Sequence, residues 1–524
     1  MSEPTPASAP ARMPRQVPFI IGNEACERFS FYGMRNILVP FLATSLLLHL
    51  PVAEREGMAK EVFHSFVIGV YFFPLLGGWI SDRWSGKYPT ILWLSLLYCV
   101  GHACLATFED DRAGFYAGLF LIALGSGGIK PLVSSFVGDQ FDQTNKQKAK
   151  VVYDAFYWSI NFGSFFASLL MPRILRGWGA AWAFGIPGIL MFVATVIFWA
   201  GRRRYVRVPP APPDPHGFLP VALSALRSRG TTGPGLVVAG AGVVLALASL
   251  VLIPRLGVVI GICLALGALL SFGGAGTAMQ LDGARGRHPG EAVEGVRAVL
   301  RILVIFALVT PFWSLFDQKA STWVLQGNQM VMLAADSWLG WLVKTPAQMQ
   351  ALNPALVMIL LPFNNLALYP ALRRLGLEPT PLRRMGAGIA FAGLAWVMAG
   401  GIQLWIDGGE RVSITWQVLP YALLTFGEVL VSATGLEFAY SQAPAAMKGV
   451  IMSFWSLSTT FGNLWVLITN ATVRNDAVLA RIASTGASQT AFLMFFFAAF
   501  AFVAALAFAV YARRYPMQDH YRRA

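Results

Sequence analysis

The sequence predicts an all-α integral membrane protein with two bundles of six helices and two extra helices between them. Of the 524 residues, 56% are hydrophobic and 13% are charged, and the mean hydropathy is +0.58. A soluble protein of this size could not bury so much apolar surface. The apolar runs continue for about 18–25 residues, as spanning helices require, whereas barrel strands have about ten residues of alternating polarity.

A span is expected wherever such a run occurs, with ends defined to within a few residues. The fourteen predicted spans are residues 26–50, 62–81, 89–108, 113–135, 151–172, 181–200, 233–253, 257–279, 299–322, 350–371, 385–405, 415–438, 449–471 and 488–511.

The spans group into two halves around a central insert. We expect a disordered cytoplasmic tail over 1–18, a six-helix bundle over 19–200, a cytoplasmic linker with two additional transmembrane helices over 201–298, a second six-helix bundle over 299–512, and a cytoplasmic tail over 513–524. The first 18 residues have no apolar core followed by a cleavage site, so they do not resemble a signal peptide. The two central spans contain almost nothing ionisable, which favours a structural insert over a site.

The positive charge of the chain lies mostly in short loops. With the N-terminus inside, basic clusters near 83–87, 146–150, 202–204, 285–287, 373–384 and 513–514 all fall on the cytoplasmic side. Both termini are therefore expected in the cytoplasm of a cell (inner or plasma) membrane protein, and the net charge of +14 does not indicate nucleic-acid binding. The four cysteines form no CxxC pair, so neither a disulfide nor a metal site is expected.

Charged side chains lie in the first predicted span, where burial in lipid is costly. Glu24, Glu27, Arg28, Phe31 and Arg35 fall on one stripe of a helix that turns about 100° per residue. Each charge at the bilayer centre costs about 2.5–3.5 kcal/mol, so several are tolerable only if they partner one another and face a polar cavity. Such a stripe is typical of a transport pathway.

Three further ionisable residues, Lys130, Asp317 and Glu428, lie deep in other spans. Acids and bases that face one another could form and break salt bridges as two halves of a carrier move. The alternative is static pairing that only holds helices together. A carboxylate that loses and regains a basic partner changes its proton affinity, so this balance favours proton coupling over a sodium site.

The loop after the second predicted span reads Gly-Trp-Ile-Ser-Asp-Arg-Trp-Ser-Gly-Lys over residues 78–87. It resembles the G-x-x-x-D-R-x-x-G-K loop of the major facilitator superfamily. Six plus six spans with a central cytoplasmic connection is also the plan of that superfamily, whose substrate site lies near the midplane between the halves.

Residues 24–33 read Glu-Ala-Cys-Glu-Arg-Phe-Ser-Phe-Tyr-Gly. They resemble the ExxERFxYYG signature of the proton-dependent oligopeptide transporters, with Phe31 in place of the first Tyr. Further matches are Gly-Ile-Lys-Pro at 128–131, Phe-Tyr-Trp-Ser-Ile-Asn-Phe-Gly-Ser at 156–164, Phe-Trp-Ser-Leu-Phe-Asp-Gln at 312–318 and Glu-Phe-Ala-Tyr-Ser-Gln-Ala-Pro at 437–444. The resemblance covers residues 19 to 512, but Leu132 stands where many members carry Asn, which leaves that wall of the pocket less defined.

The resemblance implies a role for each matching position. Arg28 would hold the carboxylate of a peptide with help from Lys130, while Glu428 would face the peptide amino group and pair with Lys130 in the empty site. The remaining implied roles are backbone hydrogen bonds from Asn161 and Asn353, pocket walls from Tyr32, Tyr71 and Trp455, an outer latch between Arg35 and Asp317, and proton-linked carboxylates at Glu24 and Glu27.

Some assignments have structural alternatives. His64 in the second span could titrate near neutral pH or could be a neutral packing residue. Asn353 precedes Pro354 and could simply lie at a kink. The Gly-Ser-Gly-Gly run at 125–128 lies inside an apolar span with no strand before it, so we predict close helix packing and no phosphate loop.

The function implied by the resemblance is proton-coupled symport of di- and tripeptides by alternating access, with no cofactor and with the proton gradient as driving force. The expected partners are di- and tripeptides, protons and the lipid bilayer, and the chain is expected to act as a monomer. The alternative on the same fold is a proton-coupled carrier of nitrate or another small organic ion. A drug/proton antiporter fits less well because a cationic drug needs no Arg28. An enzyme or sensor is disfavoured, since the sequence offers no nucleophile–base pair and no metal-ligand cluster.

Overall fold

The computed structural model describes residues 13–141, 146–210, 214–228, 233–334, 337–442 and 447–516. Within these ranges, twelve helical segments are long and apolar enough to cross a membrane. Helices α1 (Val17–Phe41) and α6 (Lys146–Trp178), with 25 and 33 residues, are long enough to cross a membrane but lie outside that set. Every predicted span thus overlaps at least one helix, and the predicted all-α class is confirmed. Residues 1–12 and 517–524, which form most of the two predicted tails, lie outside the described residues.

The chain falls into two compact units, one formed by Met1–Phe41 and Phe73–Ala211 and the other by Leu42–Phe72 and Pro212–Ala524. The second unit thus includes α2 (Val52–Phe72), although the predicted N-terminal bundle spans residues 19–200.

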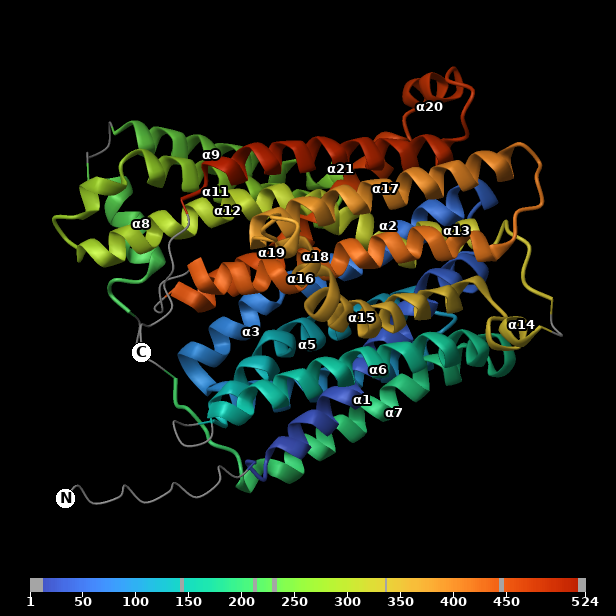
Figure 1. The fold of residues 1–524 in the computed structure, drawn as a ribbon, viewed down its shortest axis with the longest axis horizontal. Helices are drawn as coiled ribbons and strands as arrows, with labels where there is room; N and C mark the ends of the chain where they lie inside the picture. The colour runs from blue at the N-terminus through green and yellow to red at the C-terminus, as the bar shows by residue number, and fades with distance from the viewer. Residues whose placement is uncertain are drawn as a thin grey trace. The chain divides into compact units, whose positions relative to one another are not determined.

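The first unit contains six helices in the described part of the chain, and α1 packs against both α6 and α7, as Figure 1 shows. Besides α1 and α6, these helices are α3 (Pro74–Ile80), α4 (Lys87–Thr107), α5 (Arg112–Asp139) and α7 (Ala180–Ala200). Helix α5 starts with a side-chain cap, because Asp111 accepts a hydrogen bond from the backbone N–H of Gly114 at 2.8 Å.

The glycine run of α5 allows close helix packing, as predicted. A Cβ on Gly125 would lie 2.7 Å from the carbonyl oxygen of Leu94 on α4. A Cβ on Gly77 of α3 would lie 2.2 Å from the carbonyl oxygen of Gly128. Side chains at these positions would force the helices apart, so small residues set the spacing of α3, α4 and α5.

The first helix begins earlier than predicted. It starts at Val17, whereas the first span was expected at 26–50, and a π-helical turn at Leu42–Leu46 follows it. Hydropathy misplaced this helix because its charged residues lower the apolar average. The shift puts the charged stripe in the middle of the helix, so the charges cannot reach water at its end.

The second unit contains the remaining helices. In Figure 1, α9 (Pro234–Val251) and α11 (Val258–Met279), the predicted insert, lie side by side. A Cβ on Gly235 would lie 2.2 Å from the carbonyl oxygen of Gly276, so glycines also bring this pair together. The other helices are α8 (Phe218–Arg227), α10 (Ile253–Leu256), α12 (Gly290–Asp317), α13 (Thr322–Gly327), α14 (Trp338–Leu342), α15 (Leu352–Phe363), α16 (Tyr369–Arg374), α17 (Pro381–Asp407), α18 (Val418–Gln442), α19 (Lys448–Thr472), α20 (Asp476–Ala483) and α21 (Gln489–Arg514).

The core of the second unit combines aliphatic residues with large aromatic ones. Trp323 and Trp396 are fully buried, and the indole N–H of Trp396 donates to the carbonyl oxygen of Leu315 at 3.2 Å. Helix α12 packs against α19 and α21, and α19 also packs against α2. These contacts place the end of α12, with Asp317, beside polar residues of α19.

Candidate functional site

The charged stripe of α1 forms a buried ion cluster. The Nε atom of Arg28 lies 2.7 Å from Oε1 of Glu24 and 2.8 Å from Oε2 of Glu27. The three side chains are between 1% and 5% exposed. A single guanidinium therefore serves two carboxylates in a region shielded from solvent, where unpaired charge would be very costly.

Helices α6 and α7 hold the backbone of this cluster in place through a close glycine contact and a hydrogen bond. A Cβ on Gly163 of α6 would lie 3.1 Å from the carbonyl oxygen of Ala25 and 3.2 Å from the backbone nitrogen of Phe29. On the side of α7, Asn23 donates from Nδ2 to the carbonyl oxygen of Ala194 at 2.9 Å. The backbone of the charged turn is thus held from two sides.

Lys130 of α5 adds a second cation. Its charge interacts with the carboxylate of Glu27, and its Nζ atom lies 4.4 Å from the ring centroid of Phe31. A cation–π contact uses the ring face and needs no hydroxyl, which explains why Phe31 can stand in place of the first Tyr of the signature. The half-buried Tyr32 packs edge-on against Phe31, with 5.4 Å between the centroids.

Two other predicted residues lie in the first unit. Arg35, 6% exposed, sits two turns of α1 beyond Arg28. Asn161 of α6 is 8% exposed, and its Nδ2 donates to the carbonyl oxygen of Tyr157 at 3.0 Å. That bond uses one of its two donor hydrogens and leaves its amide oxygen as an acceptor.

The second unit contains a buried polar chain around His64. The Nδ1 atom of His64 lies 2.6 Å from Oδ1 of Asn463, and its Nε2 atom lies 3.0 Å from Oγ of Ser321. Nδ2 of Asn463 donates to Oδ2 of Asp317 at 2.7 Å and to the carbonyl oxygen of Thr459 at 3.0 Å. Because the amide nitrogen faces Asp317, the amide oxygen must accept from His64, so Nδ1 of His64 carries a hydrogen. His64 is thus joined to Asp317 through one asparagine.

A second polar group surrounds Glu428. Asn353 of α15 donates from Nδ2 to Oε2 of Glu428 at 2.5 Å and to Oγ1 of Thr425 at 3.0 Å. Both acceptors lie on α18, so Asn353 connects the two helices. The side chain of Glu428 is half-buried, which leaves part of it accessible.

Trp455 lies in an aromatic wall of the second unit. Its ring centroid is 5.2 Å from that of Phe306 and 5.9 Å from that of Trp313. A Cβ on Gly435 would lie 2.2 Å from the ring, so α18 approaches it closely at a position where only glycine fits. Tyr71, half-buried, is on the last turn of α2.

The sequence reasoning missed Asn463, Thr425 and Ser321. Each is a buried polar residue in an apolar helix or at its end, and polar residues at such positions could have indicated a functional role. The predicted pairs of Arg35 with Asp317 and of Lys130 with Glu428 join residues of different units and stay predictions. Of the motif at 437–444, residues 443 and 444 lie outside the described residues.

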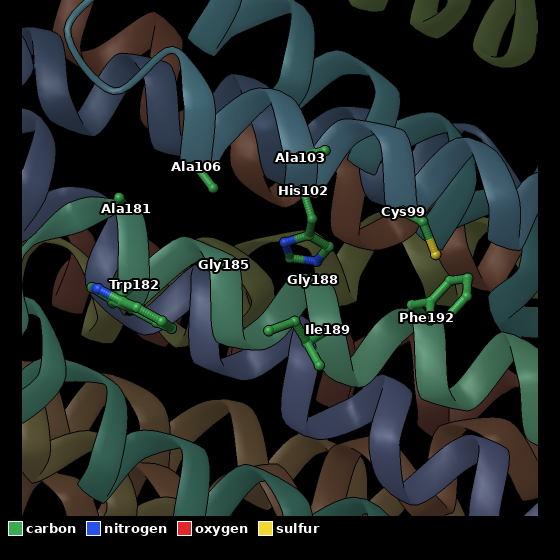
Figure 2. A pocket seen from close by; sticks show the side chains of 10 residues that line it. All are labelled: Cys99, His102, Ala103, Ala106, Ala181, Trp182, Gly185, Gly188, Ile189 and Phe192. Carbon is green, nitrogen blue, oxygen red and sulfur yellow. The ribbon is translucent and has the colours of Figure 1, made fainter.

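The first unit also has an apolar groove of about 540 Å³ between α4 and α7, shown in Figure 2. His102 and Cys99 of α4 face Trp182, Ile189 and Phe192 of α7 across it. All ten of its lining residues belong to the described part of the chain, and none is a predicted substrate or proton residue. Its apolar lining does not suit a peptide.

Comparison with known proteins decides the family. The model of the POT family matches residues 88–223 and 285–485. The chain belongs to the POT family. This POT family member is 33% identical over 428 residues to "Solute carrier family 15 member 2" of Mus musculus, covering 77% of this chain and 51% of that protein. It is 35% identical over 415 residues to "Peptide transporter family 1" of Drosophila melanogaster, covering 75% of this chain and 48% of that protein. The chain spans about half the length of the curated relatives that it matches.

Solved structures match over nearly the whole chain. An auto-inhibited POT family peptide transporter superimposes with a TM-score of 0.93 and 67% identity, covering 98% of this chain and 99% of that one. The POT family transporter PepTSo gives a TM-score of 0.93 and 66% identity, with coverages of 97% and 100%. This POT family member is therefore a multi-pass membrane protein with the predicted two-bundle fold.

Proposed function

We propose that this POT family member carries di- and tripeptides into the cell together with protons, by alternating access. The observation that carries the proposal is the buried cluster of Arg28, Glu24, Glu27 and Lys130. Two acids and two bases balance one another there. Relatives named as peptide transporters and peptide-transporter structures support the substrate class.

Charge balance in the buried cluster would couple peptide binding to proton uptake. A peptide carboxylate that binds Arg28 and Lys130 adds one negative charge to a buried group that is already neutral. A proton taken up by Glu24 or Glu27 restores neutrality and releases part of the guanidinium for the peptide. Because an uncompensated buried charge is costly, peptide and proton would bind together.

The other end of the peptide would be held in the second unit. Glu428 would accept the peptide ammonium, and Asn353 and Asn161 would hydrogen-bond the peptide backbone. The bond between Asn353 and Glu428 keeps that carboxylate in one orientation, which supports the role. Tyr32, Tyr71 and Trp455 would form walls that tolerate many side chains.

His64, Arg35 and Asp317 would act in the conformational change. The hydrogen-bonded chain from His64 through Asn463 to Asp317 supports a link between protonation and Asp317. Protonation there would weaken the proposed latch between Asp317 and Arg35, and loss of the Lys130–Glu428 pair would accompany closure. We further propose a monomer in the cell membrane with both termini in the cytoplasm.

Uptake of labelled dialanine into proteoliposomes tests the proposal, with and without an inward proton gradient. We expect gradient-dependent accumulation that unlabelled di- and tripeptides compete with and free alanine does not. An uncoupler should abolish accumulation while exchange against internal peptide continues. Exchange without accumulation would refute proton coupling, and nitrate uptake without any peptide response would refute the substrate class.

A further inference from the structure

Behind the ion cluster, α1, α4 and α5 enclose buried polar atoms that have no aligned hydrogen bond to the described residues. They are both carboxylate oxygens of Glu27, of which Oε2 is ion-paired with Arg28, the hydroxyl oxygen of Tyr98 and the hydroxyl oxygen of Ser126. The three side chains are 1%, 0% and 0% exposed. Buried polar atoms without a hydrogen bond from the protein are usually hydrogen-bonded to ordered water.

These atoms belong to one neighbourhood. The hydroxyl of Ser126 interacts with both Glu27 and Tyr98, and Tyr98 also interacts with Glu27 and with Ser30. A water needs two to four polar partners, and two carboxylate oxygens with two hydroxyl groups supply them. Such a water can accept from a hydroxyl and donate to the carboxylate.

The ring of Tyr98 is held rigidly. It stacks on the imidazole of His102 with 5.0 Å between the centroids and 20° between the planes. His102 is itself fixed, because its Nε2 lies 2.9 Å from Oγ of Ser30. A Cβ on Gly125 would lie 2.8 Å from the Cβ of Tyr98, so α5 packs tightly against this residue. The tyrosine hydroxyl therefore has little freedom to turn away from Glu27.

His102 also separates these polar atoms from the apolar groove. Figure 2 shows its ring between α4 and α7, at the groove, while its Nε2 faces Ser30. A Cβ on Gly188 of α7 would lie 2.9 Å from the Cβ of His102, so the two helices close tightly there. The polar atoms are thus bounded by an aromatic side chain on the groove side.

We propose that Tyr98 and Ser126 hold ordered water against the carboxylate of Glu27 and act as positioning residues for proton exchange at that carboxylate. The inference rests on the proposed function, in which Glu27 is one of the two proton-linked acids. Hydrogen bonds to an ionised carboxylate favour the ionised form. Removing either hydroxyl should therefore let Glu27 bind a proton at higher pH.

The charged groups that face Glu27 come from two helices. They are Arg28 and Glu24 on α1 and Lys130 on α5. Helix α4 contributes the titratable Tyr98, and α6 meets this turn of α1 through Gly163. Helix α7 meets α1 through Ile197 and the carbonyl oxygen of Ala194. The test variants leave all three charges in place.

Infrared titration of the purified full chain in lipid tests the inference without any transport step. Glu27→Gln identifies the carboxyl band of Glu27. Tyr98→Phe and Ser126→Ala should each raise the pH midpoint of that band by about one unit. This is the size expected from the loss of one hydrogen bond to a charged group. The double variant should shift by less than the sum, because both hydroxyls would hold the same water.

Tyr205→Phe is the matched control. Tyr205 is also a buried tyrosine of the first unit, 8% exposed, whose hydroxyl has no partner among the described residues. It packs among Tyr88, Phe136 and Phe198, away from Glu27. An unmoved Glu27 band in Tyr98→Phe, an equal shift in Tyr205→Phe, or no Glu27-dependent band at all would each overturn the inference.

Uptake measurements then separate the inference from the proposed function. In Tyr98→Phe, the pH midpoint of gradient-driven dialanine uptake should rise by about one unit while the KM for peptide exchange stays within about twofold. A wild-type chain without gradient-driven uptake would refute the proposed function and leave the infrared result standing. A changed KM with an unmoved midpoint would show a merely structural role and would refute the inference.

Discussion

Replacing Asn463 with alanine tests the hydrogen bonds that connect His64 to Asp317. Asn463 is fully buried on α19, and it is the amide that joins the imidazole to the carboxylate. If these hydrogen bonds stabilise the second unit, their loss should measurably lower the free energy of unfolding. If the amide merely fills space, the loss should be small.

The magnitude follows from the bonds that disappear. The bond to the carboxylate of Asp317, at 2.7 Å, involves a charged group and contributes about 1.5–3 kcal/mol. The bond to His64, at 2.6 Å, contributes about 1 kcal/mol. Asn463→Ala should therefore lower the free energy of unfolding by about 2.5–4 kcal/mol. Since the entropy of unfolding is about 2 cal/mol/K per residue, this corresponds to a fall of about 2–4 °C in Tm for a chain of 524 residues.

The assay is thermal unfolding of purified protein in detergent, followed by intrinsic tryptophan fluorescence. Asn470→Ala is the control, because Asn470 lies two turns further along α19 and its buried Nδ2 has no partner among the described residues. The control should change the free energy of unfolding by less than about 1 kcal/mol. Equal effects of the two substitutions, or a loss below about 1 kcal/mol in Asn463→Ala, would refute the reasoning.

Three further substitutions test other parts of the molecule. Gly77→Ala should destabilise the first unit by about 1–3 kcal/mol because its Cβ would clash with the backbone of Gly128, whereas Gly78→Ala, with open space around it, should melt like the wild type. Arg28→Lys should reduce gradient-driven dialanine uptake at least about tenfold with Tm preserved, because a single ammonium cannot reproduce the planar contacts with two carboxylates; wild-type uptake rates would contradict the proposed role. Glu428→Gln keeps an oxygen for Asn353 but removes the charge, so the KM for dialanine should rise about tenfold while the KM for an N-acetylated dialanine changes little, and equal effects on both peptides would count against binding of the ammonium.

The fold was predictable because its signals are local. Each apolar run identifies a helix on its own, and the glycine run at 125–128 predicted a close contact by its composition alone. The error at the first helix has the same origin. Its charges lower the hydropathy, so a helix that starts at Val17 was placed from residue 26. A local average cannot register that Arg28 is ion-paired with the two carboxylates beside it.

The candidate site was predictable only in part. The ion cluster could be found because Glu24 and Arg28 are four residues apart on one helix, and this spacing brings side chains together in any helix. The partner of Glu428 lies on another helix, and so do the partners of Glu27 other than Arg28. Asn353 is 75 positions from Glu428, and no periodicity connects them. The sequence could not predict that the hydroxyls of Tyr98 and Ser126 lie near Glu27 for the same reason. Apolar helices carry many hydroxyl groups, and most of them do not face a charged residue.

His64 shows why the sequence left two interpretations open. Its partner Asn463 lies 399 positions further along the chain, so only the packing of α2 against α19 brings the two together. A neutral histidine that serves only in packing needs one acceptor for its single N–H hydrogen, and any backbone carbonyl could be that acceptor. Instead, its acceptor is an amide whose other end donates to Asp317, while its second nitrogen lies against a hydroxyl that can donate or accept. When His64 gains a proton, Ser321 can turn its hydroxyl and accept, because the carbonyl of Gln318 lies 3.3 Å away to receive the hydroxyl hydrogen. The network therefore accommodates both charge states of His64 without leaving a buried donor unpaired, which is the property that a site of reversible protonation needs and that packing alone does not require.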